Sequence, residues 1–119
     1  MFFKRNHEIS LNRVHDTVTF RESEDHLTLK VYADPNRITA GLLHVQRKMQ
    51  NMVDDVTDEE QAAVAKELAT VIFGNEQADE LMAFYRDDGP GVMNVCLQYF
   101  RQRLSALIVK AQKKNAGTK

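Results

Sequence analysis

The chain has a single cysteine, Cys96, among its 119 residues, so no internal disulfide can form. This cysteine usage is typical of a reducing compartment. No apolar run approaches the roughly 20 residues of a membrane-spanning helix, and the first ten residues lack the apolar core of a signal peptide. We therefore expect a cytoplasmic protein without a membrane partner.

Neither sign of charge dominates, because 16 lysines and arginines stand against 17 aspartates and glutamates. This balance argues against nucleic acid as the main partner. Hydrophobic residues make up 43% of the chain, which is ordinary for a globular protein. A chain of this length can bury about two-thirds of its surface, which suffices for one domain over residues 1–119.

Two stretches near the N-terminus have the pattern of β-strands. Leu27, Leu29 and Val31 alternate with polar residues, which is typical of a half-buried strand. Val14, Val18 and Phe20 form a weaker partner, and the polar residues 21–25 between them resemble a turn. The sequence predicts a β-hairpin within residues 1–33, and the segment near Ile9 and Leu11 could add a third strand.

The first helix should begin at Asp34 and Pro35, because aspartate caps free backbone amides and proline suits the first helical turn. It should end near residues 53–56. Its apolar residues recur at steps of 4, 3, 4 and 3, which is a heptad seam: Ile38, Leu42, Val45, Met49 and Met52. Either this helix packs on the core of a small bundle, or it forms a coiled coil with another chain.

Three further helices follow. Thr57 and Glu60 form a capping box that starts the second helix, and Gly74 can close it in a left-handed conformation. Asn75 can cap a short third helix, which residues 87–91 interrupt. We predict an α+β fold in which an N-terminal β-hairpin precedes a bundle of about four α-helices over residues 34–114, with a frayed tail at 115–119.

The last helix has an apolar stripe wider than a surface helix needs. It comprises Val92, Met93, Cys96, Leu97, Phe100, Leu104, Leu107, Ile108 and Ala111. Its basic residues are expected at the helix end, where cations complement the helix dipole: Arg101, Arg103, Lys110, Lys113 and Lys114.

No arrangement of residues predicts chemistry. The four histidines fall in different predicted elements, without the i, i+4 spacing of zinc ligands. The acidic residues at 54–60 lack the ligand spacing of a calcium loop and suit a helix start. Cys96 lies within an apolar stripe, and no signature of a cysteine enzyme surrounds it. We expect no enzyme activity, no cofactor and no metal.

Binding to another protein is the remaining expectation. Methionine suits adaptable binding surfaces, although it also fills cores. The predicted protein-binding residues lie on the first and last helices: Leu42, Val45, Met49, Met52, Phe100, Leu104, Leu107 and Ile108. Some of these must form the core, and the sequence does not separate core from interface. Such faces could also join copies of the chain into a homo-oligomer.

Four segments resemble one protein family. They are DPNRITAGL at 34–42, VDDVTDEEQ at 53–61, VIFGNEQADELMAFY at 71–85 and NVCLQYFRQRLSALIVKAQKK at 94–114. Residues 27–114 are thereby similar to the tail assembly chaperone-like proteins of prophages and long-tailed phages of Gram-positive bacteria. The resemblance concerns helix punctuation and spaced hydrophobic residues rather than a catalytic motif.

The resemblance implies a non-enzymatic adaptor in the bacterial host cytoplasm. Such an adaptor binds the tape-measure protein and recruits tail-tube subunits during tail assembly. Two alternatives stay open, namely a structural subunit of the tail or of head completion, and a small regulatory nucleic-acid-binding protein that uses the basic residues of the last helix.

Overall fold

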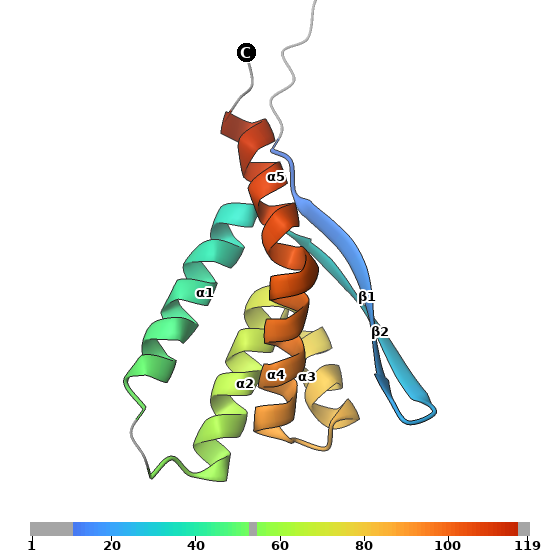
Figure 1. Cartoon of the computed structure of the whole chain (residues 1–119), viewed down its shortest axis with the longest axis vertical. Helices are drawn as coiled ribbons and strands as arrows, with labels where there is room; N and C mark the ends of the chain where they lie inside the picture. The colour runs from blue at the N-terminus through green and yellow to red at the C-terminus, as the bar shows by residue number, and fades with distance from the viewer. Residues whose placement is uncertain (1–10, 53–54, 117–119) are drawn as a thin grey trace, which may run out of the picture.

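The protein is α+β, as predicted, with a β-hairpin followed by packed helices (Figure 1). The computed structural model describes residues 11–52 and 55–116. Its elements are β1 (Val14–Glu22), β2 (Asp25–Ala33), α1 (Pro35–Gln50), α2 (Asp58–Phe73), α3 (Asn75–Phe84), α4 (Gly89–Tyr99), the π-helical turn η1 (Phe100–Leu104) and α5 (Ser105–Ala116). In Figure 1, α4, η1 and α5 form one continuous rod, with α1 on one side of it and the hairpin on the other.

The hairpin is antiparallel, and a two-residue loop at Ser23 and Glu24 joins its strands. Val14, Phe20, Leu29 and Val31 are buried on its inner face, as their period-two spacing predicts. The expected third strand is absent near Leu11, because residues 11–13 are neither strand nor helix. Ile9 lies outside the described residues.

The predicted helix starts are mostly confirmed. The side chain of Asp34 accepts a hydrogen bond from the amide of Asn36, and Thr57 and Glu60 make both bonds of a capping box. Gly74 closes α2 with φ of 87°, in the region that favours glycine. The expected cap at Asn75 is wrong, because Asn75 is the first residue of α3 and the cap position belongs to Gly74.

Two helix ends differ from expectation. Helix α1 ends at Gln50, a few residues before the predicted stop. Helix α5 extends to Ala116, so residues 115 and 116 of the predicted frayed tail are helical. Asn115 also accepts a hydrogen bond from the amide of Asn12 at 2.7 Å and donates one to its carbonyl at 3.2 Å, which ties the end of α5 to the start of the hairpin.

The expected single last helix contains a π-turn. The amide of Ser105 donates to the carbonyl of Phe100, five residues earlier, so the turn holds one more residue than an α-helical turn. The buried positions along the rod therefore follow steps of 4, 3, 5, 4 and 3: Val92, Cys96, Tyr99, Leu104, Ile108 and Ala111. The extra residue keeps Leu104 in the core, where its exposure is 0%.

Two glycines allow helices to approach closely. A Cβ on Gly89 would lie 2.8 Å from the backbone nitrogen of Ala62, so the start of α4 rests directly on the backbone of α2. A Cβ on Gly41 would lie 2.7 Å from Cγ1 of Val71, where α1 meets α2. These contacts set the positions of α1 and α4 against their shared neighbour α2.

Candidate functional site: an apolar groove beside α1

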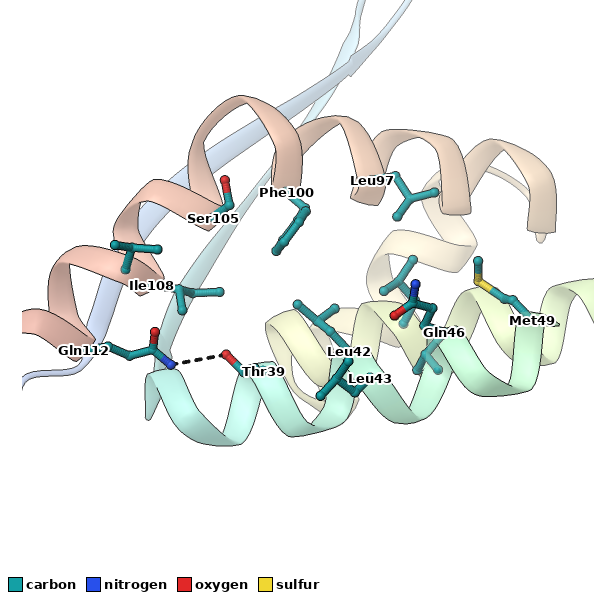
Figure 2. A pocket seen from close by; sticks show the side chains of 13 residues that line it. Thr39, Leu42, Leu43, Gln46, Met49, Leu97, Phe100, Ser105, Ile108 and Gln112 are labelled. Carbon is teal, nitrogen blue, oxygen red and sulfur yellow. Dashed lines mark hydrogen bonds between the residues drawn. The ribbon is translucent and has the colours of Figure 1, made fainter. Parts of the chain in front are cut away.

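A groove runs between α1 and the rod of α4, η1 and α5. Helix α1 packs on α2 and α5. Gln112 of α5 joins the start of α1 by donating to Asn36 Oδ1 at 3.0 Å. Further along, the side of α1 that faces α4 and η1 borders a hollow of about 480 Å3, shown in Figure 2. We call this hollow the aliphatic half of the groove.

The aliphatic half has a buried floor and partly exposed walls. Val45, Leu68 and Ile108 lie in its floor and are buried. The walls are large apolar side chains that remain half-buried or exposed: Leu42, Leu43, Met49, Leu97, Phe100 and Val109. In Figure 2, Leu42 and Phe100 reach into the space between the two walls. Leu43 and Val109 are each 49% exposed, so the mouth of the groove offers apolar surface to solvent.

A second hollow of about 460 Å3 continues the groove towards the end of α1. The two hollows share Met49 and Leu97, so we treat them as one groove. This second part contains three methionines, Met49, Met52 and Met93, and we call it the methionine half. From Thr39 to Met49 the groove follows α1 for roughly 15 Å, at 1.5 Å per helical residue, and it continues past the end of the helix to Met52.

The groove is uncharged over the described ranges 11–52 and 55–116. Its polar lining consists of hydroxyl and amide groups at the edge, including Thr39, Gln46, Ser105 and Gln112. In the methionine half, Gln61 and Asn94 have the same role. An apolar surface with a few uncharged polar groups can receive another apolar surface, but its described lining holds no acid or base that could activate the hydroxyls of Thr39 and Ser105.

In the structure, the eight predicted binding residues fall into two groups. Leu42, Met49 and Phe100 line the groove as partly exposed walls, and Met52 lines its methionine half. A second group does not form the open walls: Val45, Leu104 and Ile108 are buried, and Leu107 packs on the core while partly exposed, as the wall residues also do. Within that group, Val45 and Ile108 contribute to the floor of the groove, whereas Leu104 and Leu107 are not among its lining residues. Binding of a partner by any of the eight stays a prediction.

The π-turn explains why Leu104 is not in the groove. In a regular α-helix, Leu104 would share a face with Phe100, because residues four apart are neighbours. The additional residue in the turn moves Leu104 into the core and brings Ser105 and Val109 to the groove instead. The spacing of apolar residues in the sequence assumes a uniform α-helix, so it could not predict this change of face.

Three wall residues were not among the predicted binding residues: Leu97, which lies within the predicted apolar stripe of the last helix, and Leu43 and Val109, which lie outside the predicted stripes. Leu43 and Val109 stand one position away from the apolar stripes of their helices, next to Leu42 and Ile108. Large apolar residues just outside a core stripe widen the apolar face beyond what the core covers. That widening is the signal that could have identified them.

A polar cluster on the other side of the rod was also missed. The carboxylate of Asp16 in β1 is buried, with its side chain 7% exposed. Its Oδ2 accepts hydrogen bonds from the Tyr99 hydroxyl at 2.7 Å and from Arg103 Nε at 2.7 Å, and its Oδ1 accepts from Arg103 Nη2 at 2.9 Å. These bonds tie the hairpin to the π-turn, and we call the three residues the Asp16 clamp.

The clamp changes the proton affinities of its members. The hydrogen bonds from Arg103 lower the pKa of Asp16 despite its burial, while burial and the bond to Asp16 raise the pKa of Tyr99. Arg103 is therefore engaged with the hairpin, which corrects its expected place in a cationic cluster at the helix end. Alternation along the strand could have identified Asp16, because it lies two residues from both Val14 and Val18 and therefore on the same face as these apolar residues.

Among residues 11–52 and 55–116, the other candidates for chemistry do not assemble into a site. Cys96 is buried, and burial raises the pKa of its thiol to about 12, so it is a poor nucleophile. In the part of the chain that the structure describes, no group of three histidines, cysteines or acids could hold a metal ion. No helix formed by these residues is long and apolar enough to cross a membrane.

Comparisons with protein families, curated proteins and solved structures find no match to this chain.

Proposed function

We propose that the protein is a non-enzymatic adaptor that holds a helical segment of another protein in the groove beside α1. The observation that carries this proposal is the large apolar wall left open in the folded chain, with Leu43 and Val109 each 49% exposed. Exposed, contiguous apolar surface is costly to keep in water and usually marks a site for a partner. An amphipathic helix laid into an apolar groove is a common mode of peptide recognition.

The dimensions of the groove suit such a helix. A partner helix of about 14 residues spans roughly 20 Å and presents anchor side chains at steps of three and four. The uncharged lining favours a partner stripe without charges, since a buried charge without a counterion is strongly unfavourable. The thioethers of the methionine half can adjust to anchors of different shape.

The resemblance of residues 27–114 to tail assembly chaperone-like proteins supplies a biological partner. In this proposal the groove binds the tape-measure protein of a long-tailed phage or prophage, and the bound complex recruits tail-tube subunits. The tape-measure protein is the partner we select for the test, because the chaperone role implied by the resemblance centres on it.

The test is co-expression with the tape-measure protein, followed by purification and measurement of the dissociation constant. Leu43→Lys and Val109→Lys place a charge at the mouth of the groove, where each side chain is half exposed and folding should persist. We expect each change to weaken binding by at least about tenfold, because the new charge must be desolvated. Leu11→Lys is the matched control, since Leu11 is 59% exposed and is not among the groove-lining residues.

Two results would overturn the proposal. One is the lack of any complex with the tape-measure protein. The other is equal binding by the groove variants and the Leu11→Lys control, which would place the interface elsewhere. Recovery of the chain in finished tails would replace the chaperone role by that of a structural subunit.

A further inference from the structure

The outer face of the β-hairpin carries basic residues and no acid. The register of β1 and β2 places four cross-strand pairs on this face, and all of their residues are exposed. The pairs are His15 with Tyr32, Thr17 with Lys30, Thr19 with Thr28, and Arg21 with His26. Opposite charges in facing positions would stabilise the hairpin, yet no basic residue on this face has an acid opposite it.

The acidic residues of the hairpin lie elsewhere. Asp16 points inward to the clamp, and Glu22 shares its strand face and lies on the side of the helices, with Oε2 3.7 Å from Nη1 of Arg86. Glu24 and Asp25 are at the loop that ends the hairpin. The cations of the outer face are therefore not compensated by acids among them.

The basic surface continues at the base of the hairpin. The guanidinium carbon of Arg13 lies 5.7 Å from the centroid of the Tyr32 ring. Arg13 and Tyr32 line a hollow of about 600 Å3 together with Arg37 of α1. Both acids that line this hollow are engaged, since Asp34 caps α1 and Glu67 accepts from a lysine ammonium at 2.7 Å.

Four cations of this surface lack an acidic partner. Within residues 11–52 and 55–116, the salt bridges involve none of Arg13, Arg21, Lys30 and Arg37. Strand β1 alone has a length of roughly 30 Å at about 3.3 Å per residue. Exposed cations spread over such a length attract a ligand whose negative charges repeat along it, which is the chemistry of a nucleic acid.

We infer that the outer face of the hairpin binds double-stranded DNA in the major groove. That groove is about 12 Å wide and admits a two-stranded β-ribbon, whereas the major groove of duplex RNA is too narrow and deep. In this arrangement Arg13, Arg21 and Lys30 contact phosphates, and the threonine hydroxyls between them face the base edges. The near balance of charge over the whole chain does not oppose this binding, because the local field of the face decides it.

The inference goes beyond the proposed function and uses a different surface. The helix-binding groove lies between α1 and the rod, whereas the hairpin lies on the opposite side of the rod (Figure 1). The two surfaces can therefore be tested separately.

Fluorescence anisotropy with the full chain and a labelled DNA duplex of about 24 base pairs tests the inference. Three phosphate contacts predict a slope of about −2.7 for the logarithm of the association constant against that of the salt concentration. The affinity should accordingly fall about fortyfold between about 50 mM and 200 mM salt. A duplex RNA of the same sequence should bind at least about tenfold more weakly than the DNA.

Matched variants locate the contact. Arg21→Gln combined with Lys30→Gln should weaken DNA binding at low salt at least about tenfold and reduce the salt slope by about 2. Arg101→Gln combined with Lys110→Gln removes the same charge from exposed positions on the rod and should change neither quantity. All four side chains are exposed, so folding should persist, and circular dichroism verifies it.

Equal weakening by the two double variants would attribute binding to net charge and overturn the inference. Lack of binding to the DNA duplex, or equal binding of duplex DNA and duplex RNA, would overturn it as well. The assay contains no protein partner, so its failure leaves the helix-binding groove unaffected. Conversely, loss of the tape-measure complex in the groove variants says nothing against DNA binding by the hairpin.

Discussion

Removal of the Asp16 carboxylate should detach the hairpin from the π-turn and destabilise the fold. Asp16→Ala removes the hydrogen-bond acceptor of the Tyr99 hydroxyl, and Tyr99 is only 6% exposed. The same change removes the bidentate partner of Arg103. The hydrogen bond from a buried hydroxyl to a carboxylate contributes about 1.5 kcal/mol. The pair with Arg103 contributes less, because the arginine side chain is 59% exposed and solvent screens the interaction.

The expected loss is therefore at least about 1.5 kcal/mol, set mainly by the bond from the buried Tyr99 hydroxyl, against the roughly 5 to 15 kcal/mol that stabilises a domain. Chemical denaturation followed by circular dichroism measures it. Tyr99→Phe alone should cost about 1 kcal/mol, and the double variant should cost less than the sum of the two single variants by about 1 kcal/mol. Additive losses, or a loss below about 0.5 kcal/mol for Asp16→Ala, would refute the assigned role of the clamp.

The same clamp predicts a dependence on pH. The folded state holds the pKa of Asp16 below its ordinary value of 3.8, so the carboxylate stabilises the fold above that value. Its contribution should be lost as pH falls from about 3.8 through the lower folded pKa. The difference in unfolding free energy between the wild type and Asp16→Ala should accordingly be constant near neutral pH and shrink below about pH 4. A difference that grows on acidification would contradict this assignment.

Three further changes test local features. Gly89→Ala should destabilise the fold by at least about 2 kcal/mol in urea denaturation, because its Cβ would meet the backbone of Ala62 at 2.8 Å; wild-type stability would contradict the close contact. Arg86→Gly should raise stability by about 1 kcal/mol, since Arg86 has φ of 55° where α3 ends, and a loss would show that its side chain matters more than its backbone. Cys96 should resist a thiol reagent at pH 8 in the folded protein and react rapidly in denaturant, whereas equal rates would refute its burial.

Features that depend on neighbours in the sequence were predicted well. The hairpin strands follow from alternation of apolar residues, and the caps at Asp34, Thr57 and Gly74 follow from side-chain chemistry within a few positions. Asn75 was wrongly predicted as a cap from its side chain alone. The N-cap of α3 is the preceding residue, Gly74, and Asn75 is the first helical residue.

The candidate site was predicted only in part. Leu42, Met49 and Phe100 could be recognised as apolar helical residues, but their place beside an open groove depends on how α1 meets the rod. Leu104 looked equivalent to Phe100, and only the π-turn between them sends it to the core. The clamp at Asp16 could not be predicted from local spacing, because its partners Tyr99 and Arg103 lie more than 80 positions away in the chain.

By itself, the sequence determined the fold class and most of the helix starts, because these are set by local propensity and short-range spacing. Only the tertiary structure decided which apolar residues are core and which stay open. The close contact at Gly41 holds α1 against α2, while the π-turn rotates α5 so that Leu104 faces inward. Burial depends on the relative placement of helices, and that placement results from contacts between residues far apart in the chain.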